Sequence, residues 1–207
     1  MLPAIRQCYP ESRMPASIDD PIDIFTELFE RAAQTCIEPD AMVLSTVDEK
    51  GRASGRYVLL KGVDARGFVF YTNMESRKAR ALSANPSAAL CFYWPSIEKQ
   101  VRVEGTVERV SDADADAYFA TRSRESQIGA WASHQSATLE SRDALDRRVT
   151  EVRERFQGAA VPRPPFWSGF RVVPQSIEFW TRDPARLHVR DHYERDGNLW
   201  VRTLLYP

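Results

Sequence analysis

Basic side chains on both sides of a short turn could together bind a phosphate group. Arg56 and Lys61 flank the strand-like segment RYVLLK, while Arg77 and Lys78 open a helix that we expect over residues 76–84. Cations and free backbone amides at a helix N-terminus form an anion site. Arg56 and Lys61 point to opposite faces of a regular strand, unless a bulge or the strand end intervenes. The alternative is a solvated basic turn.

A second group combines a phenol, a guanidinium and a hydroxyl. Tyr118 and Arg122 are four residues apart and share one helix face, and Ser126 continues that line if the chain stays helical. Such a set can clamp a phosphate. A helix surface with no ligand is an equally good interpretation.

The third group lies in the C-terminal half and comprises Gln135, Ser136, Trp180 and the segment RLHVR at 186–190. In a strand, Arg186, His188 and Arg190 share one face, because side chains alternate. Potential cations on one face repel one another unless an anion or carboxylates lie opposite. An edge strand with solvated arginines is the alternative.

Several familiar chemistries are absent from the sequence. It has no GxGxxG, GxxxxGK[ST] or GxSxG motif. HVRDH lacks the glutamate of a zinc-protease helix, so we expect no metal site. The cysteines Cys8, Cys36 and Cys91 form no CxxC pair and are expected to be reduced, with Cys91 as a small core residue.

Composition excludes other classes of protein. The 207 residues are 43% hydrophobic and carry a formal charge of -1, which argues against a disordered chain and gives no bulk attraction to nucleic acid. No apolar run approaches the roughly 18 residues that span a membrane. The N-terminal residues lack the apolar stretch and cleavage site of a secretory signal. We therefore expect a cytoplasmic protein without nucleic-acid or membrane partners.

The hydrophobic period predicts a mainly β protein with helices (α+β). Residues 1–19 suggest a flexible arm, and Asp20-Pro21 begins a helix that ends near Thr35. Short antiparallel strands are expected in AMVLSTV, RYVLLK, GFVFYT, SAALCFYW, QVRVEGTVERV, GFRVV, SIEFWT, RLHVRDHY and LWVRTLL. Further helices are expected after Ser111, over 126–131 and after Ser141. Both strand sets should join in one barrel-like sheet within a single domain, residues 20–207.

Several segments together resemble pyridoxamine 5'-phosphate oxidases. The joint set is GFVFYTNMESRKARAL, QVRVEGTVERVS, YFATRSRESQIGAWASHQS, PPFWSGFRV, IEFW and RLHVR, in a chain that matches from about Pro21 to Pro207. The resemblance implies an FMN-binding split β-barrel, with the flavin in a cleft between the subunits of a homodimer. It also implies oxidation of pyridoxamine 5'-phosphate and pyridoxine 5'-phosphate to pyridoxal 5'-phosphate by O2, which yields H2O2.

The resemblance carries over to individual positions. It implies flavin binding by Arg56, Lys61, Tyr71, Thr72, Ser76, Arg77, Lys78, Gln100, Gln135, Ser136, Trp180 and Arg190. It implies substrate binding by Lys61, Tyr118, Arg122, Ser126, Arg186 and His188, of which Arg186 and His188 are the catalytic pair. Each of the three groups described above therefore matches positions that bind FMN or the substrate in this family.

This chain departs from the family pattern at a few places. Val189 replaces the aspartate of RLHDR, and Glu38 is the nearest match to an acid before the first strand. Arg6 and Tyr9 correspond only loosely to residues that cover the substrate in some members. Two other functions remain open: a split-barrel flavin oxidase or reductase of the phenazine-biosynthesis type, and a non-catalytic flavin or pyridoxal-phosphate carrier. The intact phosphate clamp argues against the first, and binding without peroxide release would indicate the second.

Overall fold

The computed structural model describes residues 20–207, so the expected arm with Arg6 and Tyr9 lies outside the described residues. The strands are β1 (Ala41–Val47), β2 (Ala53–Leu59), β3 (Gly62–Asp64), β4 (Gly67–Asn73), β5 (Ser87–Trp94), β6 (Lys99–Arg109), β7 (Trp167–Thr181), β8 (Val189–Asp196) and β9 (Leu199–Leu205). The helices are α1 (Pro21–Ala33), α2 (Arg77–Ala84), α3 (Asp112–Thr121), α4 (Arg124–Ala132) and α5 (Arg142–Arg155), with a 3-10 turn at Pro95–Ile97. The predicted α+β class with antiparallel strands is confirmed.

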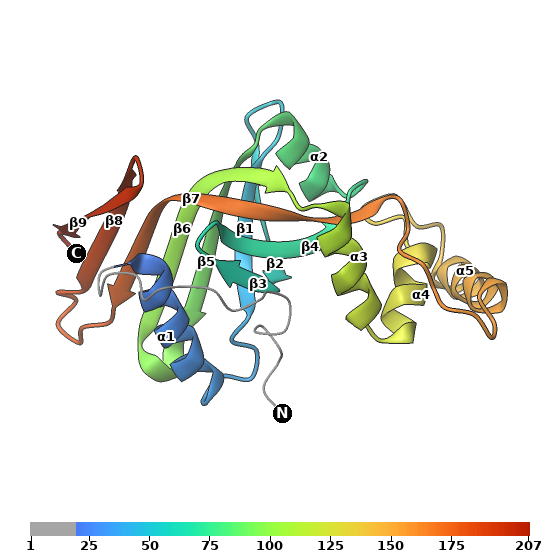
Figure 1. The fold of residues 1–207 in the computed structure, drawn as a ribbon, viewed down its shortest axis with the longest axis horizontal. Coiled ribbons are helices and arrows are strands. Elements are labelled where there is room, and N and C mark those ends of the chain that lie inside the picture. The colour runs from blue at the N-terminus through green and yellow to red at the C-terminus, as the bar shows by residue number, and fades with distance from the viewer. Residues whose placement is uncertain (1–19) are drawn as a thin grey trace.

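One curled antiparallel sheet contains both strand sets, as predicted (Figure 1). Its order is β2-β1-β5-β6-β7-β4-β3, and β8 and β9 extend it beyond β7. Strand β7 is the common element: β6 pairs with residues 170–181 along one edge, while β4 pairs with residues 167–172 and β8 with residues 176–181 of the other edge. The sheet therefore splits along β7 into two arms.

The sequence predicts two strands, GFRVV and SIEFWT, where the structure has one. Pro174, which suggests a break, lies between the β4-paired and β8-paired parts of β7. Proline is tolerated in a strand where its missing N–H has no partner. The register of β6 shifts opposite, at Gly105, where an added Cβ would lie 2.0 Å from the Val173 carbonyl oxygen. A bulge thus lets a single long strand curve without breaking.

Helix α1 closes one mouth of the curled sheet. Asp20 caps it by accepting a hydrogen bond from the Ile22 N–H at 2.8 Å. Its apolar face buries Phe25, whose ring contacts Phe68 and Phe92 at 4.8 and 5.0 Å between centroids. Core residues from β1, β4, β5, β6, β7 and β8 complete this cluster. The helix and the sheet are therefore one hydrophobic unit.

Helices α3, α4 and α5 form a second, smaller layer at the Trp167 end of β7, on the opposite side of the sheet system from β8 and β9 (Figure 1). Phe119, Ile128 and Phe156 pack there against Trp167 at the start of β7. Within residues 20–207 no helix combines the length and apolar composition that crossing a lipid bilayer requires.

Cys91 does not lie in the core. Its neighbours Leu90 and Phe92 are buried, and strand alternation therefore turns Cys91 to the opposite, half-buried face of β5. The prediction of a core cysteine is wrong because the apolar run AALCFYW hides this alternation.

The packing predicts the cost of opening a cavity at Phe25. Phe25→Ala should lower the free energy of unfolding by about 3–5 kcal/mol, since the surrounding rings cannot collapse into the space. Phe25→Leu keeps most of the volume and should cost about 1 kcal/mol. Urea denaturation followed by circular dichroism measures both. Equal losses in the two variants would contradict this account of the core.

Candidate functional site

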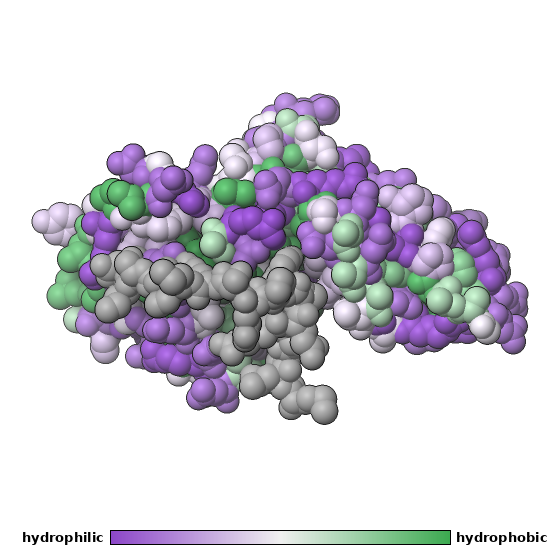
Figure 2. All heavy atoms as spheres, in the orientation of Figure 1, coloured by the Kyte–Doolittle hydropathy of each residue, from purple (hydrophilic) through white to green (hydrophobic). Residues whose placement is uncertain are grey.

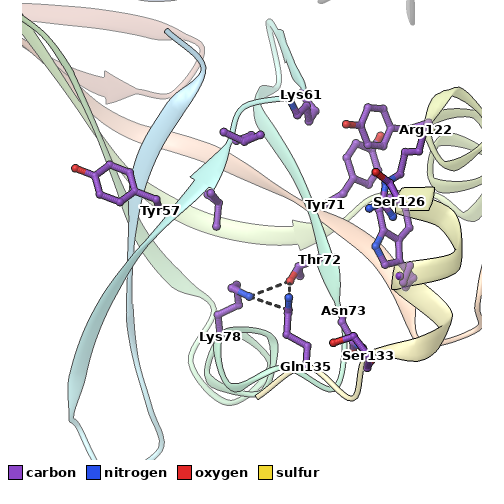
Figure 3. A pocket seen from close by; sticks show the side chains of 16 residues that line it. Tyr57, Lys61, Tyr71, Thr72, Asn73, Lys78, Arg122, Ser126, Ser133 and Gln135 are labelled. Carbon is purple, nitrogen blue, oxygen red and sulfur yellow. Dashed lines mark hydrogen bonds between the residues drawn. The ribbon is translucent and has the colours of Figure 1, made fainter. Parts of the chain in front are cut away.

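A cavity of about 490 Å³ opens between the edge of the sheet and the helical layer (Figure 3). Its walls come from β2, β4, α2, α3 and α4 and from the loop that follows α4. The lining residues are Tyr57, Val58, Leu59, Lys61, Tyr71, Thr72, Asn73, Lys78, Tyr118, Arg122, Ser126, Gly129, Ala130, Ser133, Gln135 and Trp167. The cavity therefore brings together many of the predicted ligand-binding residues from the N-terminal two thirds of the chain.

At one end of the cavity, Lys78 faces neutral oxygens. Its ammonium donates to Thr72 Oγ1 at 3.2 Å and to Gln135 Oε1 at 2.9 Å. Burial, and secondarily the nearby charge of Arg56, lowers the pKa of Lys78. Ser76, which is fully buried, caps α2 through its hydroxyl and the Ala79 N–H at 3.3 Å. Within the part of the chain that the structure describes, the Lys78 amine pairs with no carboxylate, which suits it to binding an anion.

Arg56 reaches the same region from β2. Its guanidinium donates to the Leu44 carbonyl and to Thr46 Oγ1, both at 2.9 Å. Burial, followed by the charge of Arg77, lowers the pKa of Arg56. Arg77 itself is exposed and lines a neighbouring hollow of about 340 Å³. The predicted cluster of Arg56, Arg77 and Lys78 is thus present, and its charges act on one another.

Lys61 lies beyond the end of β2, so strand alternation does not decide its direction. It lines the cavity, and its ammonium forms an ion pair with Asp40 at 2.7 Å. The sequence predicts Arg56 and Lys61 on opposite faces unless a bulge or the strand end intervenes, and the structure shows that the strand ends before Lys61.

The Tyr118–Arg122–Ser126 group meets in the cavity by a different route from the one predicted. Helix α3 ends at Thr121, and Arg122 is extended, with φ -71° and ψ 148°. Ser123 then caps α4 by accepting from the Ser126 N–H at 3.3 Å. The three side chains converge because a new helix begins: the chain does not stay helical from Tyr118 to Ser126, and the separate helix expected over 126–131 is α4, which starts at Arg124.

Arg122 is the most unusual side chain of the site. Its guanidinium carbon lies 4.9 Å from the Trp167 ring centroid, and its Nη1 is buried without a hydrogen-bond partner among residues 20–207. Burial also lowers the pKa of Arg122. Leaving a buried N–H unpaired is costly, and the cost is greater for a charged group. A ligand that supplies an anionic acceptor would remove this cost.

Three parallel rings support Arg122. Tyr71 stacks on Tyr118 at 4.1 Å and on Trp167 at 5.3 Å between centroids. These contacts hold the wall of the cavity rigid from β4 across to α3 and β7. Trp167 belongs to the segment PPFWSGFRV, but its position in the site is not evident from the sequence alone.

The remaining predicted residues lie at the other end of β7. Gln100 of β6 pairs with Trp180, Trp180 pairs with Arg190, and the His188 ring lies 4.5 Å from the Trp180 ring. Thirteen positions along β7 separate Trp180 from Trp167, which is about 40 Å of strand at ~3.3 Å per residue. These residues do not line the cavity of the same chain. Ser136 follows the cavity residue Gln135 and has a left-handed φ of 72°.

Arg186 and His188 are not on a strand, so the predicted shared face with Arg190 is wrong. Strand β8 begins only at Val189, and Arg186 has a positive φ of 65° in the preceding turn. Asp183 holds that turn by accepting the N–H groups of Ala185 and Leu187 at 2.8 and 3.2 Å. The Asp183 side chain therefore stabilises a turn at residues where the alternating pattern of RLHVR predicts a strand.

Arg190 is held by an acid that the sequence analysis missed. Glu178 accepts from its Nε at 2.9 Å and its Nη2 at 3.0 Å, and Arg102 approaches the same carboxylate at 3.3 Å. Only 8% of the Glu178 side chain is exposed. The cations of RLHVR predict an anion or a carboxylate opposite them, and Glu178 on β7, the strand next to β8, is that carboxylate for Arg190. The signal that could have revealed it is the single acid inside the apolar segment IEFW.

Comparisons with known proteins agree on the fold. PhzG from Burkholderia lata 383, solved in complex with tetrahydrophenazine-1-carboxylic acid, superposes with a TM-score of 0.87 at 33% identity over 95% of this chain and 98% of that one. An FMN-binding protein of Nostoc punctiforme superposes with a TM-score of 0.74 at 17% identity, which bears on the fold alone. The protein is thus a split β-barrel of the class that includes FMN-binding proteins.

Sequence comparison defines the family. The model described as pyridoxamine 5'-phosphate oxidase matches residues 29–156, and that of the pyridoxine 5'-phosphate oxidase C-terminal dimerisation region matches residues 167–207. A pyridoxine/pyridoxamine 5'-phosphate oxidase of Myxococcus xanthus is 59% identical over 91% of this chain and 92% of its own length. One from Rubrobacter xylanophilus is 56% identical over 91% and 87%. The chain belongs to the pyridoxamine 5'-phosphate oxidase family, and the resemblance inferred from its motifs is confirmed.

The pairing of Glu178 predicts a pH effect on stability. Hydrogen bonds from Arg190 are the main cause that lowers the pKa of Glu178 from its ordinary 4.5. A carboxyl group whose pKa is lower in the folded state stabilises that state above the unfolded pKa, and the stabilisation disappears as the pH falls through the folded value. The unfolding free energy should therefore drop below about pH 4.5. Glu178→Gln should flatten that drop, which urea denaturation across pH 3–6 would measure.

The exposed acid Glu151 on α5 provides the control. Glu151→Gln should leave the acid limb of the stability curve as it is in the wild-type protein. An unchanged limb in Glu178→Gln would show that Arg190 does not hold this carboxylate in its charged form.

Proposed function

We propose that this protein is a cytoplasmic FMN-dependent oxidase that converts pyridoxamine 5'-phosphate and pyridoxine 5'-phosphate to pyridoxal 5'-phosphate. O2 is the acceptor and H2O2 the product, and the amine substrate also releases ammonia. The family membership supports this reaction, and so do relatives that carry the name pyridoxine/pyridoxamine 5'-phosphate oxidase. The single observation that carries the proposal is the buried, unpaired Nη1 of Arg122 in a cavity rich in cations.

Two separate cationic groups would hold the two phosphates that this reaction brings together. Arg56, Arg77 and Lys78 surround the start of α2, where free amides and the helix dipole also favour an anion, and would bind the FMN phosphate. Lys61, Tyr118, Arg122 and Ser126 would bind the substrate phosphate. The fit is chemical, because the residues that line the cavity include Lys61, Lys78 and Arg122 but no carboxylate. Acids lie close by at Lys61, which pairs with Asp40, and in the hollow that Arg77 shares with Asp48 and Glu49.

Bound FMN would supply the hydride-accepting chemistry and its reoxidation by O2. The chain supplies placement and electrostatics. Thr72, Gln135 and the outer strand β2 would position the flavin ring, and Tyr71 would support it from β4. Arg186 and His188 would orient the reacting carbon of the substrate, since both are on a turn that is fixed by Asp183 and by the ring of Trp180. Clamping the phosphate at a distance from the reacting carbon converts binding energy into orientation.

A homodimer would unite the two ends of β7. Five of the predicted ligand-binding residues are remote from the cavity of their own chain: Gln100, Trp180, Arg186, His188 and Arg190. A second copy of the chain would bring them to it. The match of residues 167–207 to a dimerisation region supports this arrangement. Apolar side chains are also exposed on β2, β5 and β9, among them Tyr57 at 77%, Tyr93 at 57% and Leu204 at 70%. Figure 2 shows apolar groups at the surface where β8 and β9 lie.

A spectrum and a peroxide assay test the proposed reaction. The purified protein should show flavin absorbance, or acquire it with added FMN, and should form H2O2 and pyridoxal 5'-phosphate in equal amounts from pyridoxamine 5'-phosphate. Stoichiometric binding without peroxide would indicate a carrier instead. A colourless protein that FMN does not reconstitute would rule out the oxidase.

Arg122 provides a test of the phosphate clamp. Arg122→Met should weaken binding of pyridoxal 5'-phosphate to the FMN-loaded protein by about 2–3 kcal/mol, because one charge-assisted contact is lost. Calorimetric titration measures this. Arg142→Met, the same change at an arginine of α5 whose side chain is 81% exposed, is the matched control and should bind normally. Equal affinity in the two variants would remove Arg122 from the site.

Mixed dimers provide a test of the shared site. Arg122→Met and Arg186→Ala homodimers should each be nearly inactive. Refolding the two variants together should restore about a quarter of wild-type activity, because half the dimers are mixed and each mixed dimer has one intact site. Recovery requires Arg122 and Arg186 of one site to come from different chains. Inactive mixtures that contain verified heterodimers would place both residues in the same subunit's site.

A further inference from the structure

We propose that Asp40 limits the affinity of the pocket for doubly charged anions through its ion pair with Lys61. Asp40 would thus be a specificity-determining residue for the charge of the ligand. The inference rests on the proposed function, because it takes the phosphate of a pyridoxine derivative as the anion.

The sheet register places Asp40 beside Lys61. Asp40 immediately precedes β1 and Lys61 follows β2, and the antiparallel pair Ala41–Leu59 brings the two strand ends together. The Leu60 N–H donates to the Asp40 carbonyl at 2.8 Å, and the Lys61 ammonium lies 2.7 Å from Asp40 Oδ2. The Asp40 side chain is 15% exposed and the Lys61 side chain 25%, so the pair is partly shielded from solvent.

Lys61 differs in this respect from the other cations of the cavity. Lys78 donates to the neutral oxygens of Thr72 and Gln135, and Arg122 has an Nη1 without a partner. The residues that line the cavity include no aspartate or glutamate. Figure 3 shows Lys61 towards the Arg122 end of the cavity, with Lys78 and Gln135 at the other end. Asp40 therefore places a negative charge against one of the cations that would bind the substrate phosphate.

The carboxylate is not needed to hold the backbone of Lys61 in place. The Lys61 N–H donates to the Val69 carbonyl at 2.8 Å, so its backbone is fixed between β2 and β4 independently of the Asp40 side chain. What Asp40 contributes is charge: it offsets Lys61 and repels an incoming anion. That repulsion doubles for a dianion relative to a monoanion and vanishes for a neutral ligand. Glu38, the acid expected before the first strand, is exposed, and the acid that meets Lys61 is Asp40.

Asp40→Asn tests the proposal because it keeps an oxygen that can accept from Lys61 and removes the charge. The FMN-loaded wild type and variant are titrated with pyridoxal 5'-phosphate and with unphosphorylated pyridoxal. The variant should bind the phosphorylated compound about three- to tenfold more tightly. Its affinity for pyridoxal should be unchanged, and the gain should shrink at high salt.

Glu27→Gln removes the same charge from an exposed position on α1 and should change neither affinity. Asp40→Ser is a second neutral variant that should reproduce the gain, and flavin absorbance shows that each variant is folded. Unchanged or weaker binding of the phosphorylated compound by the folded Asp40 variants would overturn the proposal, and so would an equal gain for pyridoxal. Peroxide formation by the wild-type protein is scored separately, so the proposed function survives either result. A wild-type protein that does not bind pyridoxal 5'-phosphate would overturn both.

Discussion

The rest of this structure depends on one constraint, which is that positively charged side chains are held in a partly buried cavity. Burial lowers the pKa of Arg56, Lys78 and Arg122, which means that the protein pays in stability to keep each of them charged there. Hydroxyl, amide and carbonyl oxygens offset part of that cost without cancelling the charge. An anionic ligand offsets the remainder. The stack of Tyr71, Tyr118 and Trp167 keeps the cavity from collapsing and so preserves a site that is unfavourable until it is filled.

Strand β7 sets the distance between the two groups of candidate ligands. Trp167 at its start belongs to the wall of the cavity, and Trp180 near its end packs against His188. The bulge opposite Pro174 curves the strand but cannot bring its ends together. Under the proposed function, one chain would present half of a site at each end, and a two-fold pairing of chains would complete both halves at once. The same long strand that forms the barrel would then leave a single chain without a complete site.

Local sequence signals were sufficient for much of the fold. Caps such as Asp20 and Ser111 and the change of hydrophobic period place the helices and most strands correctly. They fail where a single residue has two structural meanings, since Pro174 continues a strand that its residue type would interrupt. Contacts such as Asp40–Lys61 and Glu178–Arg190 span 21 and 12 residues and follow from strand register, which no local pattern specifies. The motifs single out the candidate site residues, but only the sheet shows which of them share an end.

The arginines of the two ends differ in how much of their hydrogen-bonding capacity is already used. Arg190 donates to Glu178 through two nitrogens and to the Tyr206 carbonyl at 2.9 Å through the third. Its geometry is thus fixed by the protein, and two of its five N–H groups remain for a ligand. Arg122 has stacking contacts and a buried Nη1 that finds no hydrogen-bond partner among residues 20–207, so a bound anion could supply the missing acceptor. Under the proposed function, recognition energy should therefore concentrate on Arg122, while Arg190 would offer a rigid contact whose direction does not change on binding.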